Sequence, residues 1–357
     1  MGKAPRFLDR TDRIDVEWLG AVFARSAGRD VEISNLALQP IGAGNVSDTV
    51  RVTFDHDVDE GFPGSLVCKF SASDETAHAH GIASGSYARE VESYRMLAEQ
   101  RHVCRIPSLL WVDGGRDGIN LVIEDLTCST RAGRQVEGCS PAEAHSVIRE
   151  LALLHRSYFP MLEREKPEWA LTMAGEADYW SGAIASALPI IRENDRGRIT
   201  PEEWSLLRKV EARCAEWFRL PVCNGTLTHG DPRVDNILFE DRDDGTAQAI
   251  IIDWQMTGWR NPMHDVGYFL SGSVTVDDRR EHEEALLSAY HSDFGADFGY
   301  SLEDIRADYR VQLLSGLMTT VGAYSVLTMT EPVDMLLMTL LKRNLAAAAD
   351  WNSLDAF

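Results

Sequence analysis

The first third of the chain contains short, mainly apolar runs of the kind that form strands. Turns rich in Gly and Asp separate these runs, as expected where a chain reverses between neighbouring strands. The pattern predicts strands at residues 31–39, 46–54, 66–70, 108–112 and 120–124.

Two helices are predicted beside these strands. Residues 14–27 follow a start rich in Asp and Thr and then repeat apolar side chains at helical spacing. Residues 87–100 also favour a helix, with Val91 and Tyr94 on its apolar face. The segment between strand and helix, residues 71–86, is polar and rich in small side chains, and the pattern favours a mobile loop there.

The character of the chain changes after Leu126, where helical periodicity dominates. One island of strand, loop and strand interrupts it at residues 236–253. A strand-rich start and a helix-rich remainder favour two lobes, residues 1–125 (with the leading helix 14–27) and residues 126–357. The predicted helices of the second lobe cover residues 141–159, 176–191, 201–217, 278–294 and most of 302–351.

The charge balance is acidic, because 35 basic residues face 56 acidic ones and give a net charge of −21. Such a field repels nucleic acid and anionic lipid, so neither is expected as a partner, and no protein partner is predicted. A cationic substrate is one explanation of the charge; a solvated, self-repelling surface is the simpler one.

The six cysteines form no C-x-x-C pair, which argues against a zinc site and a disulfide framework and suits a reducing cytosol. The N-terminus lacks the apolar core of a secretory signal. The uncharged residues 311–330 are diluted by Gln, Ser, Gly and Thr, so they are not interpreted as a membrane span. A cytoplasmic protein is expected.

The strongest chemical pattern is THGDPRVDNILF at residues 228–239, followed by AIIIDWQ at residues 249–255. Phosphoryl transfer to a hydroxyl needs a carboxylate that orients the acceptor and takes its proton, and oxygen ligands that hold magnesium against the nucleotide phosphates. Asp231, Asn236 and Asp253 supply these groups within a short stretch. An isolated H-G-D would only indicate a capped turn; the combined pattern is far more specific.

This pattern closely resembles the aminoglycoside phosphotransferase and choline kinase-like superfamily, and within it the ecdysteroid kinase-like branch. The resemblance implies an α+β, bilobal protein-kinase-like fold, with a small antiparallel-sheet N-lobe that binds nucleotide and a large, mainly helical C-lobe. It also implies ATP or GTP with Mg²⁺, and a hydroxyl-bearing small molecule as the substrate. By resemblance, Asp231 is the catalytic base, Asn236 and Asp253 are metal ligands, and His229 braces their loop.

The N-lobe adds weaker features in the order that the family shows. The segment IGAGNVS at residues 41–47 fits a glycine-rich phosphate loop, in which Gly42, Gly44, Asn45 and Ser47 are candidate contacts. A lone G-x-G is more often a hairpin turn, but this one precedes the strand that contains Lys69.

Lys69 occupies the position of the lysine that contacts the α- and β-phosphates in kinases. A lysine on an apolar strand costs free energy unless it is paired. Glu90 is the candidate partner, by its place in the next helix and by family position; Glu92 is the rival, and a solvated glutamate is the bland alternative. At the lobe boundary, the backbone of Glu124 and Leu126 is expected to meet the adenine edge, as the family hinge does.

Three further features are interpreted as structural. By resemblance, Asp265 ties the metal-binding loop to the helical lobe, and His155 packs beneath the catalytic loop. The H-x-H pair His78 and His80 is left as solvated.

No H-R-D or A-P-E motif is present, and Asp253 begins D-W-Q where protein kinases have D-F-G, which argues against a protein kinase. A nucleotide-binding pseudokinase scaffold, an aminoglycoside-type antibiotic kinase and an unrelated acidic binding protein stay open as alternatives. The acids near the start of the predicted helix 278–294 look solvated, and residues 313–341 are rich in Met, Leu, Val and Thr. This stretch is either packed core or an apolar wall that suits an uncharged, lipophilic alcohol.

Overall fold

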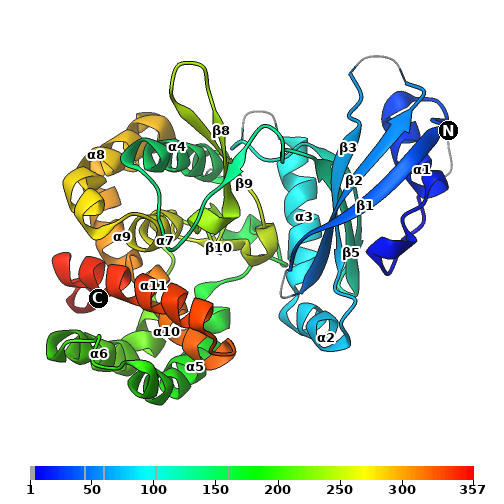
Figure 1. The fold of residues 1–357 in the computed structure, drawn as a ribbon. Helices are drawn as coiled ribbons and strands as arrows, with labels where there is room; N and C mark the ends of the chain where they lie inside the picture. The colour runs from blue at the N-terminus through cyan, green and yellow to red at the C-terminus, as the bar shows by residue number, and fades with distance from the viewer. Residues whose placement is uncertain (1–4, 44–45, 59–60, 101–102, 160, 162) are drawn as a thin grey trace. The chain divides into compact units, whose positions relative to one another are not determined.

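The computed structural model describes the chain except residues 1–4, 44–45, 59–60, 101–102, 160 and 162 (Figure 1). The chain forms two compact units. Unit 1 contains residues 1–101, 106–129 and 253–256, and unit 2 contains residues 102–105, 130–252 and 257–357. Each unit is described below by itself.

Unit 1 is built on an antiparallel sheet whose strands all fall where the sequence predicts them. The strand that contains Lys69 lies in the middle of the sheet, where Lys69 is opposite Thr49 on one side and Leu121 on the other. In order across the sheet the strands are β1 (Ile33–Ala43), β2 (Ser47–His56), β3 (Ser65–Ser71), β5 (Gly118–Glu124) and β4 (Leu109–Gly115).

The two faces of this sheet bear different helices (Figure 1). Helix α1 (Val16–Ala27) packs on one face, where Trp18 makes edge-to-face contacts with Phe70 and Trp111. Helix α3 (Ser86–Glu99) lies against the other face. Because side chains alternate along a strand, Lys69 points to the α3 face when Phe70 points to α1.

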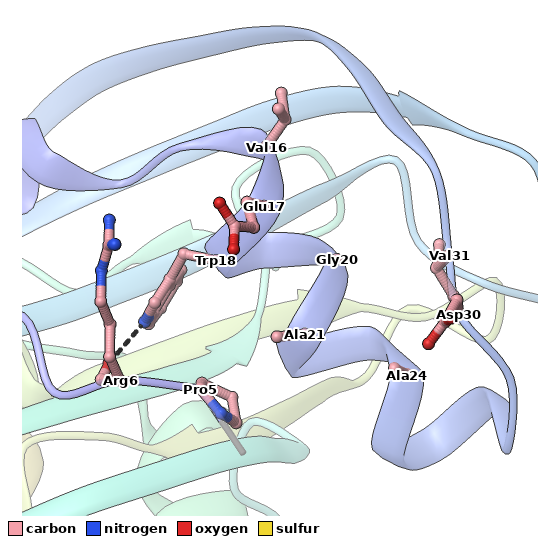
Figure 2. Close-up of a pocket in the computed structure, with 10 residues that line it drawn as sticks. All are labelled: Pro5, Arg6, Val16, Glu17, Trp18, Gly20, Ala21, Ala24, Asp30 and Val31. Carbon is pink, nitrogen blue, oxygen red and sulfur yellow. Dashed lines mark hydrogen bonds between the residues drawn. The ribbon is translucent and has the colours of Figure 1, made fainter. Parts of the chain in front are cut away.

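A pocket of about 320 Å³ lies beside α1, and Figure 2 shows its lining. The Trp18 indole N–H donates to the Arg6 carbonyl at 2.8 Å at its edge. The pocket is on the α1 side of the sheet, so it is separate from the Lys69 side. Its lining residues are Pro5, Arg6, Val16, Glu17, Trp18, Gly20, Ala21, Ala24, Asp30 and Val31.

The predicted mobile loop at residues 71–86 is wrong, because most of it forms helix α2 (Glu75–Ser84). Asp74 caps the helix by accepting from the Ala77 amide at 2.8 Å, and Gly85 ends it at φ +69°. Small residues dominate this helix and give it no apolar stripe, so periodicity could not reveal it.

Unit 2 is mainly helical, with two small sheets, β6–β8–β9 and β7–β10. The strand island predicted at 236–253 corresponds to β8 (Ile237–Asp241) and β9 (Ala247–Ile251). The remaining strands are β6 (Arg131–Ala132), β7 (Thr226–Thr228) and β10 (Gly258–Arg260). Its helices include α4 (Pro141–Tyr158), α5 (Met173–Asn194), α6 (Pro201–Phe218), α7 (Met263–Ser273), α8 (Val276–Phe294), α9 (Leu302–Gln312), α10 (Leu314–Val326) and α11 (Glu331–Asp350).

Helix α7 is a second helix that sequence periodicity missed. All of its residues are buried, so it lacks the polar face that marks a surface helix. The apolar residues 313–341 belong mostly to α10 and α11, whose side chains form a core with α5 and α6. In the described part of the chain, no helix combines the length and apolarity that crossing a membrane requires.

Candidate active site

Two carboxylates of unit 1 converge on Lys69. Its Nζ lies 2.7 Å from Glu90 Oε1 and 2.9 Å from Asp253 Oδ1. The rival Glu92 instead pairs with Arg95 at 2.7 Å, one helical turn further along α3. Residues 69, 90 and 253 are far apart in the chain, so the fold brings them together.

Burial makes this arrangement electrostatically costly unless the charges balance. The Lys69 side chain is only 14% exposed and that of Glu90 only 4%. Burial by itself would lower the pKa of Lys69, but the carboxylates of Asp253 and Glu90 raise it above its ordinary value. Burial raises the pKa of Glu90, and the Lys69 ammonium opposes that shift. Lys69 therefore stays a cation.

Asp253 adopts a backbone conformation that L-residues seldom use, with φ +67°. Its Oδ2 accepts a hydrogen bond from Gln255 Nε2 at 3.2 Å. The Gln255 carbonyl in turn accepts from Arg89 Nε at 2.7 Å, so α3 also holds the segment that follows Asp253. Strained backbone held in place by its surroundings is common at functional sites.

The glycine-rich segment is described in part. Gly42 has φ +80°, a backbone conformation that glycine adopts more easily than other residues. Ser47 is 3% exposed and lies opposite Ser71 in the sheet. The predicted contacts Gly44 and Asn45 lie outside the described residues.

The predicted hinge follows directly on β5. The Glu124 amide donates to the Ser108 carbonyl at 2.9 Å, and the Leu126 carbonyl accepts from the Ser129 amide at 3.1 Å. Between them, Asp125 accepts from Arg51 Nε at 2.6 Å. Burial by itself would raise the pKa of Asp125, but hydrogen bonds from Ser65, Thr127 and Arg51 lower it to about 2.

The candidate catalytic loop lies in unit 2, between β7 and β8. Asp231 Oδ2 is 3.1 Å from Asn236 Nδ2 and 3.3 Å from Arg233 Nε. Its Oδ1 is buried and receives no hydrogen bond from the described residues. Asn236 Nδ2 also donates to the Asp231 carbonyl at 2.9 Å, so the two predicted residues are fixed together.

His229 braces this loop in one tautomer. Its Nδ1 accepts from the Asp231 amide at 3.2 Å, so Nε2 must be the nitrogen that donates to the Ile252 carbonyl at 3.0 Å. The ring is fully buried and has both nitrogens engaged in this way. His229 is therefore placed to hold the loop backbone.

Asp265 on α7 ties down the catalytic loop, whereas the resemblance led us to expect the metal-binding loop. It accepts from the amides of His229 at 2.6 Å and Gly230 at 2.9 Å. His155 Nε2 lies 3.1 Å from Asp265 Oδ2, beneath the loop. Burial by itself would raise the pKa of Asp265, but the hydrogen bond from His155 and the nearby His264, whose Nδ1 lies 3.7 Å from Asp265 Oδ1, hold it well below its ordinary value.

The sequence analysis missed a second support of the loop, Gln135. Its side-chain Oε1 accepts from the Val234 backbone amide at 2.9 Å, and its backbone amide donates to Asp235 Oδ1 at 2.7 Å. Ser273 Oγ, at the end of α7, accepts from the same Val234 amide at 3.1 Å. Buried Arg343 donates to the Gln135 carbonyl at 2.8 Å. A polar Gln in a short loop gives no local signal of such a role.

The donor chemistry of Asn236 and Asp253 fits magnesium. Asn236 uses its amide nitrogen toward Asp231, which directs its amide oxygen elsewhere as an acceptor. Asp253 contributes a carboxylate, and hard oxygen donors are what Mg²⁺ prefers. Among the described residues, no group of three or more His, Cys, Asp and Glu side chains is placed to hold a metal. His78 and His80 therefore belong to no such group.

Two solved structures share the fold. A GDP complex of a mutant aminoglycoside 2′-phosphotransferase-IIIa matches with a TM-score of 0.53 and 12% identity, over 89% of this chain and 94% of that chain. Choline kinase LicA from Streptococcus pneumoniae matches with a TM-score of 0.53 and 15% identity, over 93% of this chain and 99% of that chain. The fold is thus the mixed α+β fold of protein-kinase-like proteins, as predicted.

The sequence matches the model of the ecdysteroid kinase-like family over residues 42–298, which is well over half of the chain. The chain belongs to the ecdysteroid kinase-like family, which confirms the resemblance found in its motifs. A comparison with curated proteins finds no match.

Proposed function

We propose that this protein is a small-molecule kinase, which transfers the γ-phosphate of ATP or GTP to a hydroxyl of a small, uncharged or lipophilic metabolite or xenobiotic. The observation that carries the proposal is the convergence of Glu90 and Asp253 on Lys69. A buried lysine kept charged by two carboxylates is suited to hold anionic phosphates. A scaffold that had lost catalysis would not need all of these groups.

The residues divide the chemistry between them. Asp231 would orient the acceptor hydroxyl and take its proton, while the acceptor oxygen bonds to the γ-phosphorus and the bond to the leaving nucleotide oxygen breaks. Lys69 would contact the phosphates, with Glu90 keeping it in place. Asn236 and Asp253 would hold magnesium, which when bound neutralises charge that develops on the phosphates.

The acids near the start of α8 support an uncharged acceptor. Glu283 pairs with Arg279 at 2.8 Å, and Glu284 pairs with Arg306 at 2.9 Å. Asp278 accepts from Thr275 Oγ1 at the helix N-terminus at 2.6 Å. Glu283 and Glu284 are thus paired with arginines within unit 2, so these two carboxylates supply little uncompensated charge for a polycation. The aminoglycoside-type kinase is therefore the second candidate.

The test is a two-step assay on the purified chain. A thermal shift with Mg²⁺ and ATP or GTP comes first, followed by a phosphate-transfer screen over lipophilic alcohols, choline and aminoglycosides. We expect stabilisation by at least one nucleotide and transfer to an uncharged alcohol, lost in Asp231→Asn. No stabilisation by either nucleotide would overturn the kinase assignment. Stabilisation with no transfer to any acceptor class would favour the scaffold.

A further inference from the structure

Tyr87 lies on α3, one turn before Glu90, and is 1% exposed. Its hydroxyl donates to the Val46 carbonyl at 2.6 Å, at the end of the glycine-rich segment. It also accepts from the Ala72 amide at 3.2 Å, just after the strand that contains Lys69. One hydroxyl thus joins the ends of two segments that are predicted to contact nucleotide phosphates.

Two residues of helix α2 lie next to this hydroxyl. His78 Nδ1 lies 3.2 Å from the Tyr87 oxygen. Because the tyrosine has one proton and gives it to Val46, His78 must be the donor in that contact. Gly81 provides the space: a Cβ there would lie 2.5 Å from Tyr87 Cζ and 2.7 Å from its oxygen. The His78 of the H-x-H pair therefore contacts Tyr87, where the sequence suggested a solvated side chain.

The same helix α3 holds the other parts of the unit 1 site. Glu90 binds Lys69, and Arg89 binds the Gln255 carbonyl two residues after Asp253. Burial raises the pKa of the Tyr87 hydroxyl, so it stays protonated and remains a donor at neutral pH. Three neighbouring positions of one helix, residues 87, 89 and 90, thus each fix a different segment.

We propose that Tyr87, seated on His78 and Gly81 of α2, is a positioning residue that fixes the end of the glycine-rich segment and thereby sets nucleotide affinity. This inference rests on the proposed function, because it assumes that the glycine-rich segment binds nucleotide phosphates. It assigns α2 a role in nucleotide binding, which neither the sequence motifs nor the family match gives to it.

The first test compares Tyr87→Phe with Tyr94→Phe. Each variant and the wild type are titrated calorimetrically with ATP and with GTP in the presence of Mg²⁺. Tyr94 is on the same helix and equally buried, so it controls for the loss of a buried hydroxyl. We expect Tyr87→Phe to weaken nucleotide binding about 3- to 10-fold, the net worth of one hydrogen bond. In turnover, the nucleotide KM should rise while the acceptor KM stays unchanged. Equal weakening in both variants, or none in Tyr87→Phe, would overturn the inference.

Gly81→Ala separates positioning from stability. Alanine favours a helix over glycine, but its Cβ would lie 2.5 Å from Tyr87 Cζ, so a purely structural role predicts a lower unfolding midpoint with unchanged nucleotide affinity. Our inference predicts weaker nucleotide binding, because the added methyl displaces Tyr87. Unaltered affinity in Gly81→Ala would contradict it. If the wild-type chain binds neither nucleotide, the kinase proposal itself fails. If the wild type binds a nucleotide and both variants bind it equally well, this inference alone fails.

Discussion

Lys69 places a positive charge in a nearly buried site between two carboxylates. The distances of 2.7 Å to Glu90 and 2.9 Å to Asp253 make it a shared partner. Removing one member of such a set leaves the others with an unbalanced buried charge. The three side chains should therefore act as a unit.

A double-mutant cycle on Lys69 and Glu90 tests this. We expect Lys69→Ala and Glu90→Ala to reduce kcat/KM to similar degrees, and the double variant to be little worse than either. Glu92→Ala is the matched control, since Glu92 pairs with Arg95 and should leave turnover nearly unchanged. Losses that add strictly would show that Lys69 and Glu90 act independently.

Substitutions of Asp231 and Asp253 should impair different properties of the enzyme. We expect Asp231→Asn to lower turnover about 10²–10⁴-fold, the usual worth of a positioned base, with nucleotide binding intact. Asp253→Ala should abolish turnover and also weaken Mg²⁺-dependent nucleotide binding, because it removes a metal ligand. The measurements are kcat and calorimetric titration with Mg²⁺ and nucleotide. Near-full activity of Asp231→Asn at saturating substrate would exclude it as the base.

At the scale of elements, the catalytic loop is shaped by neighbours that have no motif of their own. Asp265 and Ser273 come from α7, and Gln135 comes from the loop after β6. They satisfy the amides of His229, Gly230 and Val234, which would otherwise be buried donors without partners. The loop geometry thus depends on α7, one of the two helices that sequence periodicity missed.

Gln135→Ala should therefore impair catalysis more than nucleotide binding. We expect kcat to fall about tenfold, and the free energy of unfolding to fall by about 1–3 kcal/mol because a buried hydrogen bond is lost. Gln312→Ala is a control of the same chemistry: Gln312 is 7% exposed, and its Oε1 accepts no hydrogen bond from the described residues. An equal fall in kcat in both variants would show a general packing effect.

At the scale of the whole molecule, the net charge is −21, and some of the acidic side chains form ion pairs within the fold. Asp125 at the predicted hinge is one example, with a side chain only 2% exposed beside Arg51. Its folded pKa of about 2 lies below the ordinary 3.8. A depressed pKa stabilises the fold above the unfolded value, and this stabilisation is lost as the pH falls through the folded value.

Asp125→Asn should accordingly change the acid stability of the protein. At pH 7 we expect the variant to be less stable by about 2 kcal/mol, which follows from the pKa difference. The deficit should shrink as the pH falls from about 4 toward about 2, where the wild-type carboxylate loses its advantage. Urea unfolding at several pH values measures it. A deficit that stays constant over this range would contradict the assignment.

The acceptor preference also belongs to the whole molecule. We expect an aminoglycoside such as kanamycin to be phosphorylated at least tenfold less efficiently than a lipophilic alcohol, because Glu283 and Glu284 of α8 are already paired with arginines. Any binding that does occur should weaken steeply with salt, as exposed charges do. Efficient turnover of kanamycin, with no turnover of lipophilic alcohols, would contradict this prediction and favour the aminoglycoside-type kinase.

The sequence alone determined the strands of unit 1, most helices of unit 2 and the family. Apolar runs and helical periodicity indicate which segments are buried, and the spacing of Asp231, Asn236 and Asp253 indicates the chemistry. Both are local properties of the chain. The partner of Lys69 was narrowed to Glu90 or Glu92 by the same kind of pattern.

Only the tertiary structure decided what long-range packing controls. It placed Asp253 beside Lys69 across 184 residues, and it assigned Glu92 to Arg95. It showed α2 and α7, since a helix of small residues and a fully buried helix both lack an amphipathic stripe. It also put most of residues 313–341 in the core and gave Tyr87, Gln135 and Asp265 their partners. Hydrogen bonds between distant segments leave no periodic trace in a sequence, so these roles become visible only in the folded chain.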